Sequence, residues 1–209
     1  MFILYAIPIG ILLGFLLGGR FANLERIEFR WAPVALAGLA VQLVLFSGPV
    51  TERIGELGTP LYVGSTVVVL VALLRNLAIP GLAVVAVGAA ANLAAIFSNG
   101  GSMPASADAL AALGKEIGDA YSNSVAVADP SLAPLTDIFA MPRWMPLANV
   151  YSVGDVLIGV GVAIAVATAM RGGASRNLPP EYPAPGTDGS WPAERTDHTV
   201  ASETTTASR

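Results

Sequence analysis

The chain has 209 residues, of which 54% are hydrophobic and only 12% are charged, and its mean hydropathy is +0.65. A soluble globular domain carries about 25% charged and about 45–50% apolar residues, so this composition excludes a soluble enzyme and a disordered protein. The formal net charge of −4 provides no basic surface for a phosphate backbone, so we expect no nucleic-acid partner.

Side chains that bind metals or act as nucleophiles are scarce in this sequence. The chain has no cysteine, which excludes disulfides, thiolate zinc sites and a cysteine nucleophile. The chain has a single histidine, His198, near the C-terminus, so a metal or haem site with several histidine ligands is excluded. We therefore expect no metal and no cofactor.

Five apolar stretches approach the length of about 20 residues that a helix needs to cross a bilayer. They predict an all-α fold, a polytopic membrane helix bundle of about five transmembrane helices, with the lipid bilayer as its partner. The expected spans, in chain order, are 2–19, 32–46, 59–74, 77–97 and 153–170.

The first expected span contains Gly10, Gly14 and Gly18, which form a GxxxGxxxG ridge. Glycines four residues apart lie on one helix face and let another backbone approach closely. We expect this ridge to pack against another helix of the same bundle; self-association of two copies is the alternative. The apolar run starts directly after Met1 and is followed by Arg20, which reverses the charge order of a signal peptide and predicts an uncleaved helix.

The fourth expected span is built mainly of alanine and glycine, which predicts a helix packed inside the bundle. Gly88 and Asn92 are four residues apart and share one face of this helix. An amide that faced lipid would lack a hydrogen-bond partner, so Asn92 should face the interior. There it either bonds another helix or a loop, or it lines a ligand cavity.

The loop between the last two spans is predicted to be partly helical. It opens with a structural turn at Gly100, Gly101 and Pro104, where glycine tolerates the positive φ of a sharp reversal. A short helix should then begin after the N-cap Ser106 and end near Gly114.

The fifth span should begin at a helix cap. Ser152 is a favourable N-cap residue, and Asp155 falls three residues later, where a carboxylate meets free N–H groups and the positive end of the helix dipole.

Polar residues around the outer ends of the fourth and fifth spans are expected to share one site at the outer membrane face. Amides and carboxylates at that depth are costly unless they bond one another or backbone N–H groups. The expected members of this polar site are Asn92, Asn99, Asp137, Asn149, Ser152 and Asp155.

Orientation follows from the positive charges of the loops, because cytoplasmic loops carry an excess of Lys and Arg. The loops after the first and third spans and the segment after the fifth span are the basic ones. This alternation predicts an external N-terminus and a cytoplasmic C-terminus. We expect a transmembrane domain at 1–176 and a disordered cytoplasmic tail at 177–209, because the tail lacks large apolar residues. The basic flanks contain Arg20, Arg26, Arg30, Arg75, Arg171 and Arg176, and the others contain Arg53, Lys115 and Arg143.

Three blocks carry a family resemblance: Asn99-Gly100-Gly101-x-Met103-Pro104, then Asp137 followed by Pro142, then Asn149-x-x-Ser152-x-Gly154-Asp155. Together they resemble the signature blocks of a bacterial membrane-protein family known as domain of unknown function 5317. The resemblance covers roughly residues 1–172. It implies a small multi-spanning protein of the bacterial plasma (inner) membrane with no assigned activity.

Three functions are compatible with these residues. The first is a binding, scaffold or accessory component that forms a homo-oligomer or has a membrane-protein partner. The second is a membrane-embedded aspartyl hydrolase, since the block around Asp155 is weakly similar to Asn-x-Ala-Asp-x-x-Ile of lipoprotein signal peptidases. Asp137 would then be the second carboxylate that such chemistry needs. The third is a small transporter or channel.

Overall fold

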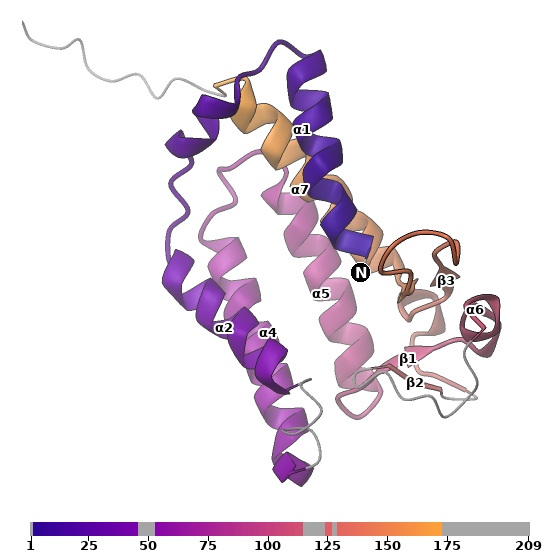
Figure 1. Ribbon diagram of the computed structural model, residues 1–209. Coiled ribbons are helices and arrows are strands. Elements are labelled where there is room, and N and C mark those ends of the chain that lie inside the picture. Colours follow the sequence, from indigo (N-terminus) through magenta and orange to yellow (C-terminus); the bar gives the residue numbers. More distant parts are fainter. Residues whose placement is uncertain (1, 46–52, 115–123, 127–128, 173–209) are drawn as a thin grey trace, which may run out of the picture. The chain divides into compact units, whose positions relative to one another are not determined.

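The structure is a computed structural model that describes residues 2–45, 53–114, 124–126 and 129–172 (Figure 1). These residues belong to one unit of the chain, Met1–Gly173. The expected disordered tail, 177–209, lies outside the described residues, as do Lys115 and the last residue of the second expected span.

Helices make up most of the described chain, so the expected helical class is confirmed. The second, third and fifth expected spans begin or end within one residue of the helices observed. The helices are η1 (Phe2–Tyr5), α1 (Ala6–Leu16), η2 (Phe21–Arg26), α2 (Ala32–Leu45), η3 (Gly55–Leu57), α4 (Gly58–Leu74), α5 (Leu82–Ser98), α6 (Ala107–Ala112), η4 (Ala133–Leu135) and α7 (Val153–Met170).

The loop between α5 and α7, called the outer loop after the side of the membrane expected for it, also contains four short strands, which the sequence analysis did not predict. β1 (Met103–Ala105) pairs in parallel with β2 (Ser124–Ala126), and β3 (Phe139–Ala140) pairs antiparallel with β4 (Val150–Tyr151). Strands of two or three residues are too short to show an alternating pattern, so only their long-range pairing defines them. The expected short helix is α6, whose N-cap Ser106 accepts a hydrogen bond from the Ala109 N–H.

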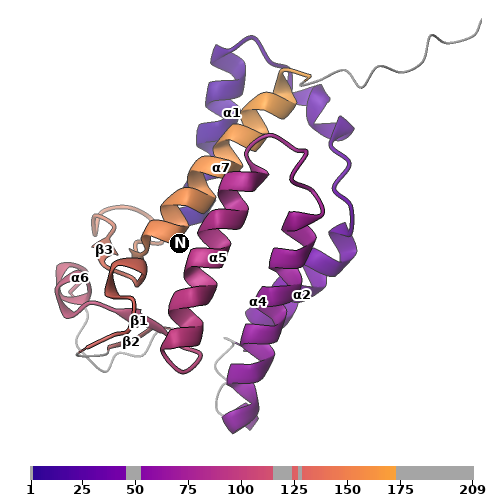
Figure 2. The ribbon, with the colours of Figure 1, turned by 180° about the vertical axis from the view of Figure 1, so that it is seen from behind.

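The long helices pack in the order α1, α7, α5, α4, α2 (Figures 1 and 2). The last helix in sequence, α7, lies between α1 and α5, whereas α2 packs mainly on α4 at the edge of the array. The N-terminal end of α7 lies beside the C-terminal half of α5, from whose end the outer loop leaves.

Close packing of α1 on α7 confirms two of the three expected ridge glycines. A Cβ atom added at Gly10 would lie 2.9 Å from the Ala163 carbonyl oxygen, and Gly14 is in similarly close contact with Met170. The expectation for Gly18 was wrong, because the helix has already ended at Leu16. Gly18 instead adopts a φ of +77°, and a Cβ atom added there would meet nothing within 4 Å.

The end of α1 has the geometry of a Schellman motif. The Gly19 N–H donates to the Gly14 carbonyl at 2.8 Å, and the Gly18 N–H donates to the Phe15 carbonyl at 2.9 Å. This pair of bonds requires a left-handed residue after the last helical turn, and glycine adopts that conformation without steric cost. Helix termination therefore accounts for Gly18 in place of helix packing.

The fourth expected span, 77–97, begins too early. Residues 77–81 form a turn in which the Ile79 N–H donates to the Asn76 carbonyl, and α5 starts only at Leu82. Pro80 disfavours a helical conformation at the residue before it, and Gly81 has a φ of +90°. The apolar composition of this turn concealed the break.

One described helix, α7, is long and apolar enough to cross a membrane, with 18 residues and a mean hydropathy of 2.1. The segments Phe2–Leu16, Ala32–Leu45, Gly58–Leu74 and Leu82–Ser98 are apolar but shorter. Length and composition alone therefore support one spanning helix, and a five-span bundle remains a proposal.

Candidate functional site

Asn92, Ser152 and Asp155 form a hydrogen-bonded cluster between α5 and α7, which we call the α5–α7 clamp. The Ser152 hydroxyl donates to Asn92 Oδ1 at 2.8 Å. The Asn92 amide nitrogen donates to Asp155 Oδ1, also at 2.8 Å. One amide thus joins the start of α7 to the interior of α5.

Two further bonds of the clamp close the N-terminus of α7. Ser152 Oγ accepts from the Asp155 N–H at 3.0 Å, and Asp155 Oδ2 accepts from the Ser152 N–H at 3.1 Å. This reciprocal pair is a capping box, in which two backbone donors without helical partners are satisfied by side chains. The two cap roles expected from the sequence are therefore confirmed.

Glycines let the two helices approach closely enough for the clamp to form. A Cβ atom added at Gly88 would lie 2.5 Å from the Gly154 carbonyl oxygen, and one at Gly154 would collide with the Asn92 amide. Two turns away, Gly81 and Gly161 make the same kind of close contact. Gly88 thus has the packing role expected of it.

Tyr62 of α4 also belongs to this region, and the sequence analysis missed it. Its phenol interacts electrostatically with both Asp137 and Asp155. Tyr62 packs against the buried cluster that Ala95 and Ile96 of α5 form with Met103. A single tyrosine near the outer end of an apolar span was the available signal, but the contact depends on how α4 packs on α5.

The main chain on both sides of Asp137 is fixed to the first strand of the outer loop. The Asp137 N–H donates to the Pro104 carbonyl at 2.9 Å, and the Asp137 carbonyl accepts from the Ser106 N–H at 3.0 Å. Asp137 and Pro104 are both buried. The carboxylate is therefore placed by the loop, whereas Asp155 is placed by α7.

Asn99 binds a different partner and is not part of the clamp. Its amide nitrogen donates to the Ser131 carbonyl at 2.8 Å and to the Ala95 carbonyl at 2.7 Å. Its amide oxygen accepts from the Ser131 N–H at 2.9 Å. Asn99 therefore ties the returning outer loop to the end of α5.

Asn149 contributes its backbone, since its carbonyl accepts from the Met141 N–H at 3.0 Å beside the β3–β4 pair. The structure thus joins three of the six expected residues directly. It places Asp137 and Asp155 each within electrostatic range of Tyr62, and it gives Asn99 and Asn149 separate roles in the loop.

The expected turn at the end of α5 is present at Gly100 and Gly101, whereas Pro104 lies beyond the turn, in β1. Gly100 and Gly101 have φ values of +71° and +90°, and the Gly101 N–H donates to the Ile96 carbonyl at 2.8 Å. Gly101 also contacts Thr59 at the start of α4. The turn therefore directs the outer loop across the end of α4, toward Tyr62.

The buried polar side chains of this region find their hydrogen-bond partners within the protein. Among the residues that the structure describes, no buried side-chain nitrogen or oxygen lacks a hydrogen-bond partner. Within the same residues, no group of three or more His, Cys, Asp or Glu side chains is arranged to hold a metal ion.

Comparison with known families matches residues 26–167, more than half of the chain, to a family of unknown function, DUF5317. The chain belongs to the DUF5317 family. The resemblance of the three sequence blocks is thereby confirmed. No curated protein and no solved structure matches the chain. The matched range contains the complete clamp of this DUF5317 member, together with Tyr62 and Asp137.

The Asp155→Asn variant is expected to lower the free energy of unfolding by about 1–2 kcal/mol. An amide has one acceptor oxygen in place of two, but rotation of the Asn92 amide can restore the bond between the two side chains. Asp155→Ala removes both acceptors and should cost roughly 1 kcal/mol more. Thermal unfolding in detergent checks this order; equal losses for both variants would contradict the capping role.

Proposed function

We propose that this DUF5317 member is an integral protein of the bacterial plasma membrane that crosses the bilayer five times. We further propose that it acts as a binding, scaffold or accessory component and not as an enzyme. The observation that supports embedding is the apolar outer surface of the helices, where Leu16, Leu43 and Phe97 are 73%, 75% and 75% exposed. Soluble monomers rarely expose contiguous apolar patches larger than a few hundred Å².

The short helices are compatible with this proposal. At 1.5 Å per residue, α4 and α5 each span about 25 Å of the roughly 30 Å hydrocarbon core. A bilayer accommodates a short helix by local thinning or by the reach of flanking side chains, at a modest cost per ångström. Tryptophan is enriched where a membrane protein meets the lipid headgroups, and Trp31 and Trp144 are 47% and 82% exposed.

The orientation that we propose has the N-terminus outside and the C-terminus in the cytoplasm. Four exposed arginines lie at the bundle end that we assign to the cytoplasm, and the outer loop lies at the other end. Hydrogen bonds connect the segments that carry these arginines at this end of the bundle. The Arg20 N–H donates to the Met170 carbonyl, and the backbone of Arg30 bonds the Asn76 side chain. These arginines are Arg20, Arg30, Arg75 and Arg171.

The clamp supports a structural role in preference to aspartyl hydrolysis. Each carboxylate oxygen of Asp155 accepts a hydrogen bond, one from Asn92 and one from the Ser152 N–H. These bonds hold the Asp155 side chain in place as a helix cap. Shared protonation with Asp137 would need one of these acceptors, so the hydrolase alternative is not favoured.

Replacement of an apolar surface residue by arginine tests the embedding. Leu39 is half exposed in the middle of α2, and Leu147 is 63% exposed in the outer loop. Leu39→Arg should reduce the fraction of protein that resists alkaline carbonate extraction, because an arginine at the centre of a lipid-facing helix is costly. Leu147→Arg is the matched control and should leave that fraction unchanged. Carbonate extraction of the native protein, or normal integration of Leu39→Arg, would refute the proposal.

A further inference from the structure

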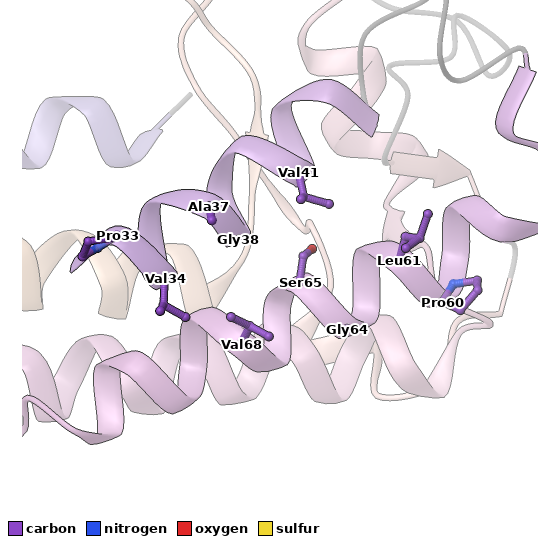
Figure 3. A pocket seen from close by; sticks show the side chains of 10 residues that line it. All are labelled: Pro33, Val34, Ala37, Gly38, Val41, Pro60, Leu61, Gly64, Ser65 and Val68. Carbon is purple, nitrogen blue, oxygen red and sulfur yellow. The ribbon is translucent and has the colours of Figure 1, made fainter. Parts of the chain in front are cut away.

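An apolar groove with a volume of about 530 Å³ lies between α2 and α4 (Figure 3). Val34 and Val41 line it from α2, and Leu61 and Val68 line it from α4. Gly64 keeps its floor open, since a Cβ atom added there would meet nothing within 4 Å. The groove therefore offers an extended apolar surface at the edge of the helix array.

One end of this groove carries positive charge. Val68 lines the groove, and Arg75 follows seven residues later, two helical turns along the same face of α4. The Arg75 guanidinium carbon lies 5.0 Å from the centre of the Trp31 ring, and Trp31 is two residues before the groove residue Pro33. Arg75 and Trp31 thus stand at the end of the groove.

A second arginine is fixed at the same end through its backbone. The Arg30 N–H donates to Asn76 Oδ1, and the Asn76 amide donates to the Arg30 carbonyl, both at 2.7 Å. Asn76 is buried, and its amide also donates to the Ala72 carbonyl of α4. These hydrogen bonds of Asn76 hold the start of α2 beside the end of α4, so the backbones of Arg30 and Arg75 are close together.

The charge of these two arginines is available for a ligand. Both side chains are exposed, and within the described residues neither forms an ion pair with a carboxylate. The Arg75 guanidinium carbon lies over the Trp31 ring in a cation–π contact, and such a contact uses none of the guanidinium N–H groups as hydrogen-bond donors to an oxygen. Guanidinium groups in such settings favour phosphate, which they bind through paired hydrogen bonds.

We propose that this groove binds one anionic phospholipid, with an acyl chain between α2 and α4 and the headgroup phosphate at Arg30 and Arg75. The inference rests on the proposed membrane embedding, which places this end of the bundle in the anionic cytoplasmic leaflet. The groove supplies the apolar length that a chain needs, and the arginines supply the charge that distinguishes an anionic lipid from a zwitterionic one.

The proposal is tested with the full-length protein in phosphatidylcholine vesicles that contain a trace of spin-labelled phosphatidylglycerol or spin-labelled phosphatidylcholine. Flotation with the vesicles is checked first. Electron paramagnetic resonance then measures the immobilised fraction of each labelled lipid. We expect the protein to immobilise phosphatidylglycerol with about a threefold preference over phosphatidylcholine.

Four variants locate the preference, two at the proposed site and two as controls. Arg30→Gln combined with Arg75→Gln should abolish it, whereas Arg171→Gln, which removes an exposed arginine of the same bundle end, should leave it intact. Gly64→Leu fills the groove and should reduce the immobilised fraction of both lipids, and Val67→Leu, outside the groove, should not. Loss of the preference in Arg171→Gln as well would indicate general attraction to the surface and overturn the site.

Three other results would also overturn the inference. A protein that floats with the vesicles but shows no preference for phosphatidylglycerol refutes the lipid site and leaves the embedding intact, whereas failure to float refutes the embedding itself. A native dimer in detergent that Gly64→Leu converts to a monomer, without any change in lipid preference, would assign the groove to a second copy of the chain.

Discussion

Asn92→Ala is expected to lower the free energy of unfolding by about 3–5 kcal/mol. The variant removes the acceptor of the Ser152 hydroxyl and one donor to the Asp155 carboxylate, in a region where Ser152 is fully buried. A buried hydroxyl and a partly buried carboxylate oxygen that both lose a partner cost more than the net contribution of one surface hydrogen bond.

The matched control for this variant is Asn149→Ala. Asn149 lies near the same end of α7, but the bond it makes to Met141 uses its backbone carbonyl, which alanine retains. It should therefore change the unfolding free energy by less than about 0.5 kcal/mol. Thermal unfolding of both variants in the same detergent gives the comparison. Similar midpoints for the two variants would show that the clamp does not hold α5 to α7.

Gly154→Ala is expected to have the second largest effect, a loss of about 3 kcal/mol. The new methyl group would collide with the Asn92 amide and would lie 2.8 Å from the Gly88 carbonyl oxygen. Backbone atoms cannot move aside as a flexible side chain can, so the helices must separate and the clamp must lengthen. For a described unit of this size, the loss corresponds to a fall in unfolding midpoint of roughly 6–12 °C.

Gly64→Ala is the control for this substitution and should have the opposite sign. A methyl group at Gly64 meets no atom within 4 Å, and alanine is favoured over glycine in a helix by about 1 kcal/mol. The midpoint of Gly64→Ala should therefore be unchanged or higher. A fall of equal size in both variants would mean that the loss reflects glycine replacement in general and not the α5–α7 contact.

Local rules predicted the parts of this structure that depend on neighbouring residues. The Ser152–Asp155 cap, the Gly100–Gly101 turn and the start of α6 after Ser106 all follow from side chains within a few positions of the bonds that they make. The same rules failed at Gly18 and before Leu82, where an unbroken apolar run concealed the helix ends.

Contacts between distant segments were beyond those rules. Tyr62 lies within electrostatic range of Asp137 and Asp155 because α4 packs on α5 and because η4, just before Asp137 in the loop, packs on α5 and α7. The bond between Asn99 and Ser131 depends in the same way on the path of the loop. Sequence periodicity places a residue on a helix face, but it does not determine which helix covers that face.

Single-cysteine labelling tests the membrane embedding most directly, because the chain has no native cysteine. One exposed position can be labelled at each expected depth in the membrane. Ala112 ends α6 in the outer loop, Val160 lies within α7, and Ala78 lies in the turn between α4 and α5. In intact cells, a membrane-impermeant maleimide should label Ala112→Cys but not Ala78→Cys, which should react only after permeabilisation, and Val160→Cys should stay unlabelled in both conditions. Labelling of Val160→Cys once the membrane is permeabilised, at the rate of Ala78→Cys, would contradict a bundle embedded in lipid.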